Sequence, residues 1–346
     1  MCGGCRFTLL AVLIGLVGGS TSSISEAEVN DKAALCDVLT IQFENDEFGG
    51  SDRHYTNGLR LACTARPPRF VRDRLPRPAG RDLRTSRITY AAGHSIYTPD
   101  DLVTREPIPD DQPYAGWLYV SLGLETQTIP KAASSVRYVD HVELQLGVVG
   151  PLAGGKQLQS FTHDVLNASP PAGWDNQLDN EPGVNLFYSR SFGPFEGSTA
   201  TPDNRKPRLF LDVTPEVGLA LGNIQTYGAA GFTVRLGNHL PDDAGPATLR
   251  PSLPRPGAFS GRDRSSAYIF AGLEGRAVAR NIFLDGNSFD DDGPSVDKKT
   301  LVGEARVGVA VTYHDLSFSY TQVFRTREFA DQAPQTYGSI TVSVGL

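Results

Sequence analysis

Three separated segments of the chain carry side chains suited to acid–base and metal-assisted chemistry. The first contains Asn45 and Asp46, whose oxygens are hard ligands of the kind that Ca²⁺ binds. The second is the turn GSDRHYTNGLRL, in which Thr56 offers a hydroxyl group. The third contains Gln159 and His163. Because imidazole exchanges protons near neutral pH, His163 is the best candidate for a general base.

The segment around His163 is predicted to form a short amphipathic helix between residues 155 and 167. Gln159 and His163 are four residues apart, so they are neighbours on one helix face. Another face is apolar and is expected to pack against the wall of the fold. Its members are Leu158, Phe161 and Val165.

The rest of the chain alternates apolar and polar residues, which predicts strands with one apolar and one polar face. About twelve such runs occur. They lie near residues 37–46, 57–65, 86–96, 114–127, 138–149, 183–192, 206–221, 227–237, 265–278, 299–313, 315–326 and 336–346. An even number of strands of this length favours an all-β, roughly twelve-stranded antiparallel transmembrane β-barrel of the outer-membrane type. A secreted β-sandwich is the alternative that alternation leaves open.

The N-terminus has the pattern of a secretory signal. A short basic start precedes an apolar run at residues 7–17, and small residues follow. The apolar run is too short for a membrane-spanning helix, which takes roughly 20 residues. We therefore expect residues 1–27 to be a signal peptide and residues 28–346 to form the barrel domain.

Charge and missing motifs exclude several functions. The formal net charge of −7 argues against nucleic-acid binding. Cys2 and Cys5 leave with the expected signal peptide, and residues 28–346 contain no Cys-x-x-Cys zinc spacing. They also contain no Gly-x-Ser-x-Gly elbow with its partners and no phosphate-binding loop. Cys36 and Cys63 remain after signal removal, but strand alternation puts them on opposite faces, so their pairing stays open.

In an up-and-down barrel, the connections after the first, third and fifth strands meet on one rim. The first connection holds Asn45, Asp46 and the turn with Thr56, the second spans residues 97–112, and the third spans residues 150–182 with Gln159 and His163. The three connections could therefore form one site. Asn45 and Asp46 can share that site only if their strand ends or bulges there. The Arg-rich residues 66–84 and the Pro-rich residues 238–264 are long for the turns of the other rim. His94 and His141, within strands, are expected to face the lumen, and His54 to be solvated.

At these residues the chain resembles the lipid A 3'-O-deacylases of Gram-negative outer membranes. The motifs follow the family's order and cover most of the mature chain. They are Glu44-Asn45-Asp46, the Asp52-Arg-x-Tyr-Thr-x-Gly58 turn, Ile96-Tyr-Thr-Pro99, Tyr114-Ala-Gly-x-Leu118, Gly147-Val-Val-Gly-Pro151, and Gln159-x-x-x-His163 with Trp174 and Gln177.

The resemblance implies a twelve-stranded outer-membrane enzyme that uses Ca²⁺ to hydrolyse the 3'-linked acyloxyacyl ester of lipid A in the outer-leaflet lipopolysaccharide. We expect the protein to be a monomer. It implies catalytic roles for His163, Gln159, Asn45 and Thr56, and metal binding by Asp46 and Asn45. The family's active-site lysine has no match, because Thr104 stands at that spacing. The alternatives are a porin-like or structural barrel, which would conduct ions or lack catalysis, and a broader calcium-dependent phospholipase.

Overall fold

The computed structural model describes residues 35–49, 54–76, 79–131, 136–166, 171–193, 195–199, 209–238, 240–241, 265–290 and 293–346. The expected signal peptide and most of the Pro-rich stretch therefore lie outside the described residues. None of the helices within these ranges is long and apolar enough to cross a membrane.

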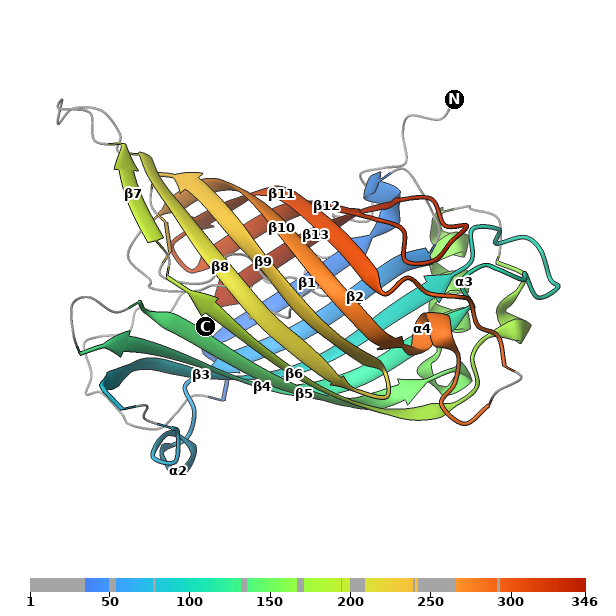
Figure 1. Ribbon diagram of the computed structural model, residues 1–346, viewed down its shortest axis with the longest axis horizontal. Coiled ribbons are helices and arrows are strands. Elements are labelled where there is room, and N and C mark those ends of the chain that lie inside the picture. Colours follow the sequence, from blue (N-terminus) through green and yellow to red (C-terminus); the bar gives the residue numbers. More distant parts are fainter. Residues whose placement is uncertain are drawn as a thin grey trace.

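Antiparallel strands close into a barrel (Figure 1). The ring of twelve runs from β1 to β6 and from β8 to β13, and it closes through β1–β13 and β6–β8 pairs. A short additional strand, β7 (Phe195–Thr199), pairs with β8 beyond the ring. The ring strands are β1 (Val38–Asn45), β2 (His54–Ala65), β3 (Arg81–Thr98), β4 (Ala115–Pro130), β5 (Tyr138–Val149), β6 (Glu181–Phe192), β8 (Leu209–Gly222), β9 (Gln225–Gly237), β10 (Ser266–Asn281), β11 (Leu301–Tyr313), β12 (Leu316–Arg325) and β13 (Gln335–Gly345). The predicted twelve-stranded barrel is confirmed.

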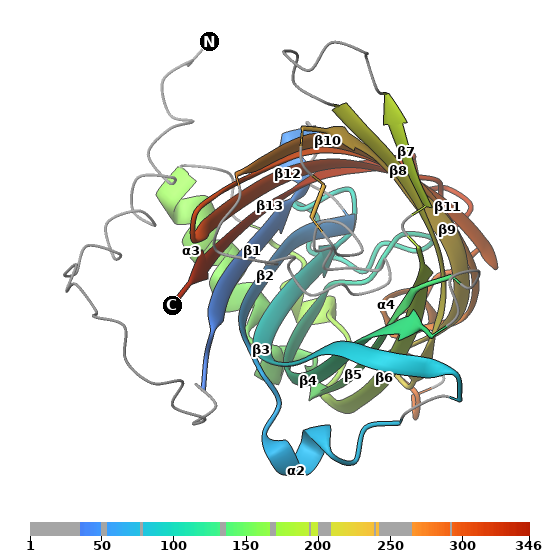
Figure 2. The same cartoon turned by 90° about the vertical axis from the view of Figure 1, so that its left-hand side faces the viewer.

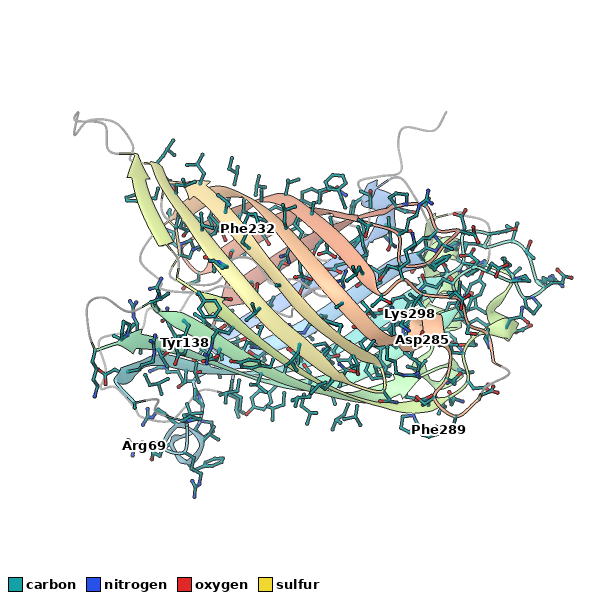
Figure 3. All side chains as sticks on the ribbon, viewed as in Figure 1. Arg69, Tyr138, Phe232, Asp285, Phe289 and Lys298 are labelled. Carbon is teal, nitrogen blue, oxygen red and sulfur yellow. A yellow bond between two sulfur atoms is a disulfide. The ribbon has the colours of Figure 1, made fainter. Side chains whose placement is uncertain are left out.

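The alternation of the sequence becomes the two faces of the wall. On β4, Val120 and Leu122 are exposed on the outside, whereas Tyr119 and Ser121 are buried inside. Side chains extend outward along the whole wall in Figure 3. An exposed apolar belt suits contact with lipid, while polar residues fill the interior.

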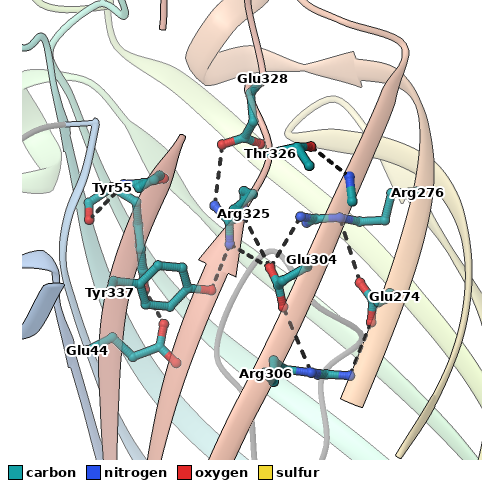
Figure 4. Close-up of polar contacts among 12 residues, drawn as sticks. Glu44, Tyr55, Glu274, Arg276, Glu304, Arg306, Arg325, Thr326, Glu328 and Tyr337 are labelled. Atoms are coloured by element: carbon teal, nitrogen blue, oxygen red, sulfur yellow. Dashed lines mark hydrogen bonds and ion pairs between the residues drawn. The ribbon is translucent and has the colours of Figure 1, made fainter. Parts of the chain in front are cut away.

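Paired charges fill part of the lumen (Figure 4). Glu304 accepts from Arg325 at 3.0 Å and from Arg276 at 3.4 Å. Arg325 also donates to the hydroxyl of Tyr337 at 2.7 Å. These groups are almost fully buried, and pairing offsets the high cost of removing charges from water.

The barrel has two distinct rims (Figure 1). One, called the α3 rim, carries η1 (Asp46–Gly49), α3 (Gly155–Leu166), η3 (Trp174–Asn176) and α4 (Ile282–Asp285). At this rim Phe283 of α4 stacks on Tyr97 with ring centroids 3.8 Å apart, and both belong to a buried aromatic and aliphatic cluster. The opposite rim carries α2 (Arg69–Arg72) and the tight turn between β11 and β12.

Two predicted details need correction. Cys36 and Cys63 form a disulfide, with Cα atoms 5.4 Å apart. The parity argument fails because β1 begins only at Val38, so Cys36 precedes the strand and does not follow its alternation. In addition, β3 begins at Arg81, which puts part of the expected Arg-rich loop into a strand.

Candidate active site

Helix α3 lies on the barrel wall at its rim. Before it, Gly150 and Gly154 adopt φ angles of 98° and 73°, which glycine tolerates best, so the chain can leave β5 sharply. A Cβ atom at Gly155 would lie 2.5 Å from the Cη2 atom of Trp174, so only glycine lets the helix start against this indole. The predicted helix is therefore present, with bounds one residue shorter at its end.

The helix packs through Leu158 against a cluster of Ile96, Tyr114 and Trp174. Ile96 lies on the outward face of β3, so α3 covers the outside of the wall. Phe161 was expected to join this contact, but it is 66% exposed. Leu158 and Phe161 are three residues apart, and of these two only Leu158 makes the contact. The side chain of Val165, the third member expected on this face, lies outside the described part of the chain.

Gln159 and His163 are buried on α3, with 3% and 7% of their surfaces exposed. The indole N–H of Trp174 donates to Oε1 of Gln159 at 2.7 Å. Because an indole can only donate, this bond assigns the oxygen of the amide and leaves its NH₂ group as the second end. Among the described residues, Nε2 of Gln159 is buried and has no hydrogen-bond partner.

The wall residues form a second group. Asn45 is the last residue of β1, and its Nδ2 donates to the carbonyl of Thr56 at 3.1 Å. Its Oδ1 accepts from the backbone N–H of Glu47 at 2.7 Å. Thr56 shares a hydrogen bond of 2.7 Å with the hydroxyl of Thr98. Asn45 thus holds the start of η1 and the return strand together.

A β-bulge gives Thr56 this position. Tyr55 pairs with Tyr97 and Asn57 with Ile96, so Thr56 is an extra residue in β2. A bulge turns side chains away from strict alternation, and Tyr55 and Thr56 are both buried although they are adjacent. β1 also ends at Asn45, so the condition for Asn45 and Asp46 to share a site is met.

The two groups lie on the same outer face. One group consists of Gln159 and His163 on α3, and the other of Asn45 and Thr56 on the wall. Hydrogen bonds join residues within each group, and the packing of α3 on the wall relates the two groups to each other. Thr98 follows Ile96 by two residues on β3, so the two side chains point the same way about 7 Å apart. Leu158, which contacts the Ile96 cluster, directly precedes Gln159.

Asp46 begins η1 and is fully buried. Its carboxylate and the Oδ1 of the preceding residue, Asn45, are hard oxygen donors, which fit Ca²⁺ better than a softer metal. Within the described ranges, no group of three or more His, Cys, Asp or Glu residues could hold a metal. Amide, hydroxyl or backbone oxygens and water would therefore have to complete a calcium shell.

Thr104, which stands at the spacing of the family's active-site lysine, carries no charge and is bonded to a carboxylate. Its hydroxyl donates to Asp101 at 2.7 Å, and this bond holds the pKa of the Asp101 carboxyl below its usual range. The lysine on α3, Lys156, pairs with Asp175 of η3 at 2.8 Å. That hydrogen bond lowers the pKa of Asp175 and joins the start of α3 to η3.

Three histidines outside α3 test the sequence interpretation. His141 faces the lumen as expected, 3.4 Å from Glu143. His94 was expected there too, but it lies on the outward face and its Nε2 is 2.8 Å from the carbonyl of Ala153. His54 was expected to be solvated, but it is 2% exposed.

Trp174 and Thr98 were not among the predicted site residues. Both occur in motifs of the sequence, but nothing in those motifs says that Trp174 orients Gln159 or that Thr98 holds Thr56. Only the packing of η3 under α3 and the pairing of β2 with β3 bring these partners together.

A family model and one solved structure agree with the barrel fold. The family model described as "Outer membrane protein LpxR" matches residues 9–346. The structure "LpxR from Salmonella typhimurium" is similar with a TM-score of 0.70 and 24% identity, over 89% of this chain and 100% of that chain. The β domain of the Bordetella autotransporter BrkA gives a TM-score of 0.44 and 9% identity, over 89% and 97% of the two chains. No curated protein matches the chain significantly.

Proposed function

Because the chain belongs to the LpxR family of outer membrane proteins, we propose that it is a lipid A deacylase of the Gram-negative outer membrane. The specific reaction would be calcium-dependent hydrolysis of the 3'-linked acyloxyacyl ester. Water and the ester would yield a free fatty acid and a hydroxyl group on the glycolipid.

The single observation that carries this proposal is the buried amide of Gln159, one helical turn before the buried His163 on α3. Trp174 occupies Oε1, so the NH₂ end remains available to donate. A buried donor without a partner is costly, and an ester oxygen of a lipid lying along the outer wall would satisfy it. His163 is one helical turn further on, within reach of the same reacting centre.

In the proposed mechanism, His163 takes a proton from water as the oxygen attacks the ester carbonyl carbon. The NH₂ group of Gln159 donates to the carbonyl oxygen as negative charge develops there. His163 then returns the proton to the departing alkoxide. Thr56, held by Thr98, would offer its hydroxyl to the substrate, while Asn45 would position Thr56 and η1.

Asp46 and the Oδ1 of Asn45 would hold Ca²⁺. When bound, the ion would supply charge that polarises the ester carbonyl. The protein's own part is to fix these oxygens at the start of η1, where β1 ends.

The test is mass spectrometry of lipid A after incubation with the purified protein and Ca²⁺ in detergent. His163→Ala should lower the rate at least about 100-fold, the usual contribution of a general base. His314→Asn is the matched control, because His314 lies in the exposed β11–β12 turn at the other rim with φ 51°, which asparagine tolerates. Unchanged lipid mass with the wild-type protein, or full activity of His163→Ala, would refute the proposal.

Offering phospholipid and lipid A side by side separates this function from a broader phospholipase. Release of fatty acid from both at similar rates would favour the phospholipase. Release from lipid A alone would support the deacylase.

A further inference from the structure

A short basic turn marks the rim opposite α3. Residues 66–75, called here the arginine turn, contain four arginines and one aspartate in a chain whose formal net charge is −7. The turn follows β2 directly and includes α2. Figures 1 and 2 show α2 outside the ring of strands, at the end of the barrel away from α3 and close to β3.

Internal contacts fix the shape of this turn. The backbone N–H of Arg66 donates to Oδ2 of Asp37 at 3.1 Å. Nη1 of Arg74 donates to the carbonyl of Phe70 at 2.7 Å and so closes the end of α2. Leu75 is buried, with 7% of its surface exposed. The turn therefore presents its side chains on an ordered backbone.

The side chains that it presents are cationic and aromatic. Phe70 is 65% exposed, and the side chains of Arg66 and Arg72 are 81% and 50% exposed. Nε of Arg66 is 3.8 Å from a carboxylate oxygen of Asp37, and Nε of Arg72 is 4.0 Å from one of Asp73. Ion pairs this long and this exposed contribute little, so the positive charge of the turn stays effective.

Other arginines at this rim are differently placed. Arg81 and Arg190 lie over the ring of Tyr138 at 3.8 and 4.0 Å, and Arg190 pairs with Asp140 at 2.7 Å. Figure 3 shows Arg69 and Tyr138 at the same end of the molecule, far from Lys298. Tyr138 thus engages its arginines within the barrel wall, whereas the arginine turn points away from it.

We propose that the arginine turn binds the phosphates of anionic phospholipids in the leaflet next to this rim, with Phe70 in the interface. Guanidinium groups match phosphate oxygens in a bidentate manner, and aromatic rings favour the membrane–water boundary. Each arginine near an anionic surface increases binding by about fivefold. The turn sits where the lipid-facing wall ends, so it would fix the depth of the barrel in the bilayer. This inference does not depend on the proposed catalysis.

The test is native mass spectrometry of the purified protein in detergent with equal amounts of phosphatidylglycerol and phosphatidylcholine of identical acyl chains. The wild-type protein should retain phosphatidylglycerol in at least about fivefold excess, as one engaged arginine would give. Arg66→Gln/Arg69→Gln/Arg72→Gln should bring the ratio near one, and Arg74 is kept because its bond to the Phe70 carbonyl closes the end of α2. Lys299→Gln/Arg327→Gln, which removes two exposed cations of the α3 rim, should leave the ratio unchanged.

Phe70→Ala should weaken retention of both lipids about equally, because it removes interfacial contact and leaves charge. Two further arms separate other sources of phosphate. Loss of the preference in phosphate buffer of equal ionic strength would reveal a site for free anions. Displacement of phosphatidylglycerol from the turn by lipopolysaccharide would assign the turn to the outer leaflet, which contains lipopolysaccharide, and not to a phospholipid leaflet. Either result, no preference in the wild type, or an unchanged preference in the triple variant would overturn the proposal.

Discussion

The indole of Trp174 donates a 2.7 Å hydrogen bond to the side-chain oxygen of Gln159. Trp174 belongs to η3, which follows α3 in the chain and returns beneath it. Its ring also lies 5.0 Å from that of Tyr114 and within the cluster that holds α3 on the wall. Trp174 thus fixes both the position of α3 on the wall and the orientation of the Gln159 NH₂ group, the proposed donor.

Trp174→Phe should therefore reduce deacylation without unfolding the barrel. Phenylalanine keeps an aromatic ring but cannot donate a hydrogen bond. The side-chain amide of Gln159 can then rotate, so its NH₂ group is no longer held toward the substrate. The unpaired buried acceptor should cost about 1–3 kcal/mol, which corresponds to roughly a 5- to 150-fold slower reaction if the loss falls on the transition state. The measurement is the initial rate of lipid A hydrolysis at saturating Ca²⁺.

A double variant decides whether this loss acts through Gln159. Gln159→Ala should lower the rate by itself, and adding Trp174→Phe should then change little, because the bond is already gone. Full additivity of the two losses would show that Trp174 acts by another route, such as the packing of α3.

Calcium should bind through Asp46, and the effect should appear in stability as well as in activity. A ligand that binds only the folded state raises the unfolding temperature, so Ca²⁺ should stabilise the wild-type protein and EGTA should reverse the gain. Asp46→Asn keeps the size of the side chain and removes its charge. This variant should lose most of the calcium-dependent shift together with the activity.

Glu47→Gln is the matched control, because Glu47 is the neighbouring residue of η1 and is exposed. Its calcium response should equal that of the wild type. An unchanged shift in Asp46→Asn would mean that the metal, if it binds, is held elsewhere.

Much of the barrel could be predicted from the sequence because its signal is periodic and local. A lipid-facing wall requires every second residue of a strand to be apolar, so the strands appear directly in the pattern. The helix of residues 155–166 was equally accessible, since no breaker interrupts it. The exposure of Phe161 could not be predicted, because the surface against which a helix packs decides how many of its apolar residues become buried.

Two residues were misplaced for different reasons. Cys36 precedes β1, so the alternation inside that strand does not apply to it. His94 lies within β3 but was assigned to the lumen by its polarity, although η2 (Pro151–Ala153) covers it from outside and offers a carbonyl partner. Such contacts depend on tertiary structure and have no sequence period.

The disulfide between Cys36 and Cys63 should stabilise the barrel where β1 begins and β2 ends. It closes a loop with a sequence separation of 27 residues, for which chain entropy predicts up to about 3.5 kcal/mol. The double variant Cys36→Ser/Cys63→Ser should therefore unfold at a lower urea concentration than the wild-type protein, as followed by tryptophan fluorescence. Wild-type protein treated with a reductant should match the double variant. Equal midpoints for oxidised and reduced wild-type protein would contradict a stabilising role.

The barrel should be electrically silent in planar bilayers, unlike a porin. At the α3 rim the side chains of α4 pack with Tyr97 inside the mouth, and paired charges follow deeper in the lumen. Replacing Ile282, Phe283 and Leu284 by alanine should loosen this packing and raise the ionic conductance. The control Leu118→Ala/Val120→Ala/Leu122→Ala shortens three exposed residues of the outer wall and should stay silent. Large, steady conductance of the wild-type protein would instead favour a porin-like function, because an open pathway through the lumen would then exist.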